Sequence, residues 1–80
     1  MRVSEITTIW EMRNLASGES ARCEIHRLQD GVCDVCVFFD GGPAPIRTPC
    51  ADELASLEYA LGVSVGLAAT GWVDTSSEQG

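Results

Sequence analysis

The chain has 80 residues, of which 45% are hydrophobic and 21% charged, the composition of one small globular domain rather than of a disordered tract. Twelve acidic side chains against five basic ones give a net charge of −7, which disfavours binding to nucleic acid and to anionic membrane surfaces. A chain of this length has a marginal core, so we expect modest stability unless a metal, disulfides or a second copy adds to it.

The first residues of the chain and its longest apolar run favour a cytoplasmic protein. The first residues lack the apolar core of a signal peptide, and the longest apolar run, Ala60 to Val73, is too short and too glycine-rich for a membrane span. We therefore expect a cytoplasmic chain whose four cysteines are reduced thiols. All five cations are arginine, which indicates a GC-rich bacterial genome rather than a function.

Three successive segments have the alternating pattern of strands. The pattern predicts an antiparallel three-stranded meander over residues 6–13, 21–28 and 32–40. Turn-forming residues follow the first strand at 14–20, and a run of glycine and proline at 41–45 is expected to end the sheet.

A single helix is predicted over residues 49–70, after the sheet. Thr48 suits its capping position, Pro49 its first turn and Gly71 its end, while Cys50 is expected to be a small core residue in the first turn. An apolar stripe runs along this helix at spacings of three and four: Leu54, Leu57, Leu61, Val65 and Ala68.

The stripe keeps its phase through residues 62–66, so we favour helix over a short strand there despite two glycines. The fold class is therefore expected to be α+β, with a single β-β-β-α domain over residues 1–73. The helix would pack on one face of the sheet, and residues 74–80 would be a disordered tail.

The hairpin turn decides which side chains share a face. A three-residue turn over 29–31, with Gly31 in the left-handed conformation, places Ile25 opposite Val35. A two-residue turn would mix charges with the apolar side chains, so the pattern selects the longer turn. The apolar face then carries the expected core: Trp10, Met12, Cys23, Ile25, Val35, Val37 and Phe39.

The alternative interpretation of this hairpin is a metal site, because Cys23, His26, Cys33 and Cys36 have pairwise spacings that zinc sites use. In the favoured register, however, Cys33 and Cys36 point to opposite faces of one strand and cannot close on one ion. We therefore expect no metal and no cofactor, and retain a zinc-binding protein using these four residues as an alternative. His26 facing Asp34 is interpreted as a surface pair rather than an acid–base pair, and no enzymatic activity is expected.

The sheet face away from the helix is the predicted interaction surface, since an apolar strip of Ile9, Cys36 and Phe38 lies there among charges. The predicted interface residues are Ile9, Glu11, Arg13, Arg22, Glu24, Cys36 and Phe38. We expect a non-enzymatic interaction module that forms a homodimer or binds another protein. The alternative suggested by the charge is an acidic inhibitor of a basic nucleic-acid-binding protein.

Several short segments carry a resemblance. Residues 9–13, 21–25 and 38–41, with a helix that ends before Gly71 and Trp72, are similar to small uncharacterised bacterial proteins built from three strands and one long helix. The likeness covers about residues 6 to 73. It implies the β-β-β-α fold and no activity.

Overall fold

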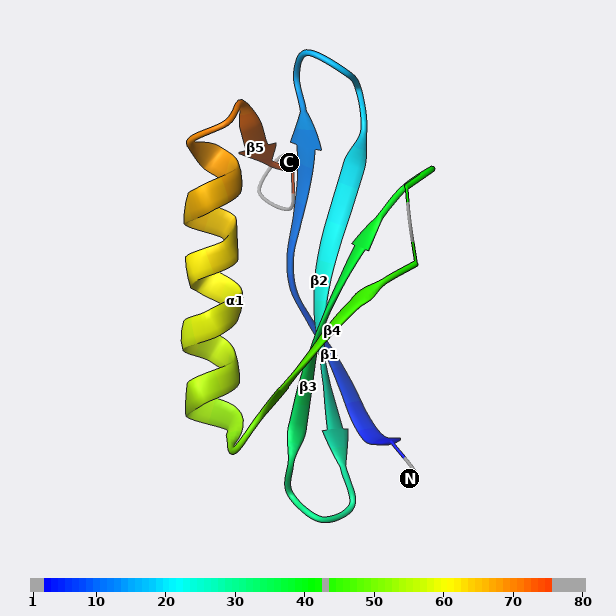
Figure 1. Ribbon diagram of the computed structural model, residues 1–80, viewed down its shortest axis with the longest axis vertical. Helices are drawn as coiled ribbons and strands as arrows, with labels where there is room; N and C mark the ends of the chain where they lie inside the picture. Colours follow the sequence, from blue (N-terminus) through cyan, green and yellow to red (C-terminus); the bar gives the residue numbers. More distant parts are fainter. Residues whose placement is uncertain (1–2, 43, 76–80) are drawn as a thin grey trace.

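The computed structural model of the protein describes residues 3–42 and 44–75. One helix packs against a five-stranded antiparallel sheet with strand order β4-β3-β2-β1-β5 (Figure 1). The elements, in chain order, are β1 (Val3–Asn14), β2 (Ser20–Leu28), β3 (Cys33–Phe39), β4 (Ile46–Cys50), α1 (Glu53–Ala68) and β5 (Trp72–Asp74). The α+β class is confirmed, but the predicted count of three strands is wrong.

The hairpin of β2 and β3 has the predicted register. Ile25 pairs with Val35, and every other predicted partner follows in step. Gly31 has a φ of +89°, a conformation that glycine adopts without the steric cost of a Cβ. The Leu28 N–H donates to the Val32 carbonyl at 2.9 Å and closes the three-residue turn. Local turn chemistry and the apolar pattern therefore agree on one register.

Strand β4 was not expected, because Pro43, Pro45 and Pro49 resemble strand breakers. The strand pairs with β3 at the edge of the sheet, where Thr48 lies opposite Val35. An edge strand tolerates proline, since the missing N–H on its outer side removes no ladder hydrogen bond. Thr48 and Pro49 therefore belong to the sheet, and their predicted roles at the start of the helix are wrong.

Helix α1 begins later than predicted. Asp52 is its N-cap, and its carboxylate accepts a hydrogen bond from the Ala55 N–H at 2.8 Å. The helix covers Glu53–Ala68 instead of residues 49–70, so Cys50 precedes it in β4. Residues 62–66 are helical, as expected.

A fifth strand follows the helix. Gly71, with a φ of +97°, turns the chain so that β5 pairs with the free edge of β1. Asp74, placed by prediction in a disordered tail, lies opposite Met12 in this ladder. The Thr75 N–H donates to the Glu11 carbonyl oxygen at 2.8 Å, and residues 76–80 of the predicted tail lie outside the described residues.

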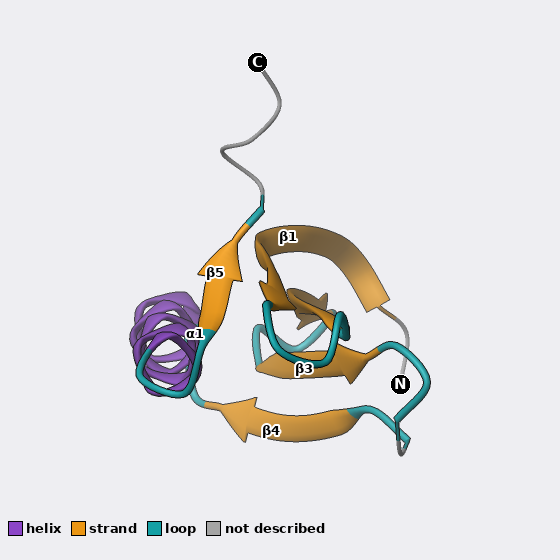
Figure 2. Cartoon of the chain, turned by 90° about the horizontal axis from the view of Figure 1, so that it is seen from above, coloured by secondary structure: helices purple, strands orange, loops and turns teal. Residues whose placement is uncertain are grey.

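The core lies between the sheet and the helix, and the predicted apolar face is confirmed as its sheet side. The side chains buried there are Trp10, Met12, Ala21, Cys23, Ile25, Cys33, Val35, Val37, Ala60 and Trp72. Phe39 packs against them, with its ring 5.9 Å from that of Trp72 in an edge-on arrangement. Seen end-on, the helix stands beside β5 and the end of β4 (Figure 2).

The helix meets the sheet with small side chains, which allows a close approach. Ser56 and Ala60 are its two fully buried residues, and the Trp10 indole N–H donates to the Ala60 carbonyl oxygen at 2.8 Å. A leucine in place of Ala60 would hold the helix away from Trp10. Of the predicted apolar stripe, only Leu57 packs against the core, whereas Leu54, Leu61, Val65 and Ala68 are exposed.

Candidate functional site

The sheet surface away from α1 is formed by every second side chain of the paired strands β2 and β3. Arg22, Glu24 and His26 of β2 project there, opposite residues 38, 36 and 34 of β3. We call this surface the polar sheet face; it comprises Arg22, Glu24, His26, Asp34, Cys36 and Phe38. It holds the histidine and one of the cysteines, which are candidate catalytic groups.

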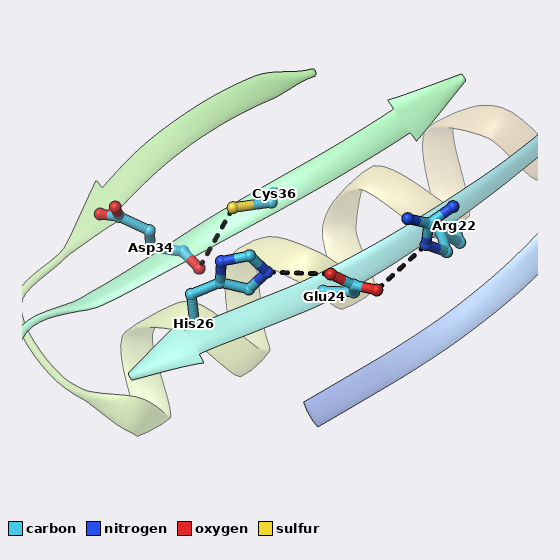
Figure 3. A network of polar contacts seen from close by, with 5 residues as sticks. All are labelled: Arg22, Glu24, His26, Asp34 and Cys36. Carbon is cyan, nitrogen blue, oxygen red and sulfur yellow. Dashed lines mark hydrogen bonds and ion pairs between the residues drawn. The ribbon is translucent and has the colours of Figure 1, made fainter. Parts of the chain in front are cut away.

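Glu24 is the centre of the polar sheet face (Figure 3). Its carboxylate accepts a hydrogen bond from Arg22 Nε at 3.0 Å and is joined to His26 Nε2 at 2.9 Å. The hydrogen bond with His26 is the largest cause that holds the pKa of Glu24 below its usual range; burial opposes it and Arg22 reinforces it. His26 and Asp34 are cross-strand neighbours as predicted, but the imidazole bonds to Glu24.

Cys36 lies directly across the ladder from Glu24, yet it is not placed to act as a nucleophile. Its side chain is 0% exposed, and burial, the largest cause, raises the pKa of the thiol. The sulfur lies 3.9 Å from the Asp34 carbonyl oxygen (Figure 3). A protonated, inaccessible thiol cannot attack a substrate, so this arrangement supports a structural network.

The four alternative zinc ligands do not converge. Cys23 lies on the core side, opposite Val37, and burial raises the pKa of its thiol to about 11. Cys33 is also in the core cluster, whereas His26 and Cys36 belong to the polar sheet face. Within residues 3–42 and 44–75, no three histidine, cysteine, aspartate or glutamate side chains are grouped so that they could hold a metal ion.

The predicted apolar strip is not an open surface. A bulge between Thr8 and Trp10 shifts the register of β1, so Ile9 packs against the core; its predicted place on the opposite face is wrong. Cys36 is buried, and Phe38 is half-buried beneath the Arg22 guanidinium, which lies 4.2 Å from the ring centroid. The charged members, which include Glu11 and Arg13, remain, and their role in an interface stays a prediction.

A row of open apolar side chains lies on the helix instead. Leu54 is 67% exposed, Leu61 56% and Val65 70%. Gly62 and Gly66 form the neighbouring row, and a Cβ built on either glycine meets no atom within 4 Å. We call these five residues the apolar helix face. Its signal in the sequence was the leucine and valine stripe, which we had assigned to the core.

A groove of about 440 Å³ extends the apolar helix face toward the edge of the sheet. It runs between the helix and the strands β1 and β5, and its lining includes Ile9, Leu61, Val65 and Val73. The surface available to a partner therefore comprises a helix ridge and a groove beside it.

No family model, curated protein or solved structure matches this chain. The resemblance to small bacterial proteins therefore stays a prediction. In the part of the chain that the structure describes, no helix has the length and apolar character needed to cross a membrane.

Proposed function

We propose that the chain is a non-enzymatic protein-interaction module that self-associates through the apolar helix face. The observation that carries this proposal is the exposure of three large apolar side chains along one side of a single helix: Leu54, Leu61 and Val65. Each is only partly exposed, so it forgoes about 1–2 kcal/mol of available burial in an isolated chain. Several large exposed apolar side chains on one side of a helix are typical of an interface.

The neighbouring glycines favour another helix as the contacting element. Gly62 and Gly66 lie one helical turn apart, with open space above both. In a solvated helix each glycine costs about 1 kcal/mol relative to alanine, and no contact within the described residues offsets that cost. Small residues at this spacing allow two helix backbones to approach closely.

A second copy of the chain supplies a matching surface. In a two-fold arrangement the apolar helix face of each copy covers that of the other. The 16-residue helix is about 24 Å long, so the contact is at the small end of specific interfaces and should dissociate on dilution. Each copy carries −7, so added salt should strengthen the dimer by screening repulsion.

Two matched substitutions test the proposal. Leu61→Glu places a charge on the apolar helix face, and Phe38→Glu places the same charge on the polar sheet face. Sedimentation equilibrium over a range of protein concentrations should show that Leu61→Glu weakens self-association by at least about 100-fold, whereas Phe38→Glu leaves it near the wild-type value. A wild type that stays monomeric at millimolar concentration would refute self-association, and loss of the dimer only in Phe38→Glu would assign it to the sheet.

The acidic-inhibitor function remains a second candidate, since the helix carries Glu53 and Glu58 and no basic residue. A basic partner would be attracted by the net charge, so its binding should weaken as salt rises, opposite to self-association. Measuring both the dimer and the binding of a polyarginine peptide between low and high salt separates the two functions.

A further inference from the structure

Two thiols face each other across the edge of the sheet. Cys33 of β3 and Cys50 of β4 are direct partners in the antiparallel ladder. Both lie toward the core, where Cys33 is buried and Cys50 packs against the cluster. Residues directly opposite in such a ladder have Cβ atoms about 4.5–5.5 Å apart, and a disulfide needs about 3.5–4.5 Å. Each sulfur now lies beside the carbonyl oxygen two residues earlier in the chain, that of Gly31 at 3.9 Å for Cys33 and that of Thr48 at 3.8 Å for Cys50. Formation of the bond therefore requires both side chains to turn and the two strands to move slightly closer.

The other two cysteines have no such partner. Cys23 lies opposite Val37, and Cys36 lies between Glu24 and Arg47 on the polar sheet face. All four cysteines fall within the described residues and are free thiols in the structure. The ladder therefore singles out one pair.

We propose that Cys33 and Cys50 form a reversible disulfide by exchange with a low-molecular-weight disulfide. The Cys50 thiolate attacks one sulfur of the small disulfide and releases one small thiolate, which leaves a mixed disulfide on Cys50. The Cys33 thiolate then attacks Cys50 Sγ and releases the second small thiolate. The two protein thiols are oxidised, the small disulfide is reduced, and the two protein protons end on the two small thiols.

Cys50 is the entry point because it is the more accessible of the pair. Burial is the largest cause that raises the pKa of its thiol, and Cys33, Asp34 and Asp52 raise it further. Little thiolate is present at neutral pH, so exchange should accelerate as pH rises toward the thiol pKa. The pair is thus a slow, reversible site rather than a fast catalytic thiol.

The bond would fix one edge of the sheet. None of the five residues of β4 is fully buried, and the strand has only β3 as a neighbour in the sheet. Asp52, the cap of α1, lies two residues after Cys50. A cross-link between Cys33 and Cys50 therefore ties the edge strand and the start of the helix to the centre of the sheet.

The test is oxidation of the full chain with a redox buffer of oxidised and reduced glutathione, followed by blocking of free thiols in denaturant and digestion with trypsin. Cleavage after Arg27 and Arg47 separates residues 28–47 from 48–80. We expect these two peptides to be linked, with Cys23 and Cys36 blocked. Fragmentation of the linked peptide should assign the bond to Cys33 rather than Cys36.

Three variants serve as controls. The link should persist in Cys36→Ala and vanish in Cys33→Ser and Cys50→Ser, and the oxidised wild type should melt higher by on the order of 10 °C, reversibly on reduction. Glutathione retained on Cys50 as the sole product, a bond to Cys36, or an unchanged or lower melting temperature would overturn the proposal. The fragmentation of the wild-type peptide decides the pairing even where a variant fails to fold.

Discussion

The polar sheet face and the apolar helix face differ in how far their apolar side chains are exposed, and the difference is the opposite of what their composition suggests. The polar sheet face is rich in charge, yet Cys36, opposite Glu24, is fully buried and Phe38 lies under Arg22. The apolar helix face carries leucine and valine, yet it is open. Long charged side chains cover apolar neighbours with their aliphatic stems, and the helix has no arginine or lysine to do so. The charged side chains of the sheet therefore leave little apolar surface open, while Leu54, Leu61 and Val65 of the helix stay exposed.

The comparison assigns different roles to the two surfaces. The polar sheet face contributes to the stability of the monomer through the Glu24 network, and the apolar helix face is proposed to mediate association. Substitutions in the network should change unfolding, and those on the apolar helix face should change the dimer. The side of the same helix that packs on the sheet should be the most sensitive to substitution.

Ala60→Leu should have the largest effect on stability. Ala60 is fully buried against Trp10, so a leucine overpacks the contact and breaks the hydrogen bond to the indole, at a cost of about 3 kcal/mol. The matched control is Ala55→Leu on the exposed side of α1, which should change stability by less than about 0.5 kcal/mol. Urea unfolding of both variants measures the difference; equal stabilities would show that the helix faces the sheet in another orientation.

Glu24→Gln should have the next largest effect, about 1–2 kcal/mol at neutral pH, because it replaces charge-assisted hydrogen bonds with neutral ones. The folded-state pKa of Glu24 is lowered, so the stabilisation is present above the unfolded value of about 4.3 and is lost as pH falls through the folded pKa.

Urea unfolding of the wild type and of Glu24→Gln from pH 7 to pH 2 checks the sign of this prediction. The gap between the two curves should narrow on acidification, and Glu19→Gln in the exposed turn should show no comparable gap. A gap that is absent at pH 7, or that widens in acid, would contradict the role given to the Glu24 network.

Gly62→Ala should have the smallest effect and the opposite sign. Its Cβ would meet no atom within 4 Å, so the gain in helix propensity should stabilise the monomer by about 0.5–1 kcal/mol. Gly31→Ala, at a φ of +89°, should instead destabilise the chain by about 1 kcal/mol. Both are measured by urea unfolding at low protein concentration. A destabilising Gly62→Ala would mean that this face is not free in the monomer.

The sequence could predict those parts of the fold where two local signals, turn chemistry and the alternation of apolar residues, indicate the same structure. In the hairpin, Gly31 and the alternation around Ile25 and Val35 point to the same register. Strand β4 was missed because proline is excluded from central strands but tolerated at an edge, and the edge is a property of the whole sheet. Asp52 was overlooked as the cap because Thr48 and Pro49 form an equally good local signal.

The candidate site was less predictable than the fold. Ile9 lies on the core side of the sheet because a bulge interrupts β1. The alternation of apolar and polar residues does not show where a bulge occurs. The phase of the helix depends on the Trp10 side chain, whose bulk and hydrogen bond select Ala60 rather than a leucine as the contact. Both outcomes depend on contacts between residues far apart in the sequence.

The most direct test of the apolar helix face is an isotope-filtered NMR experiment on a mixed sample of labelled and unlabelled chains. It detects contacts between copies only, at a concentration where the dimer forms. We expect intermolecular contacts from the methyl groups of Leu61 and Val65 and none from the ring of Phe38. Contacts from Phe38 with none from Leu61 or Val65 would contradict the account.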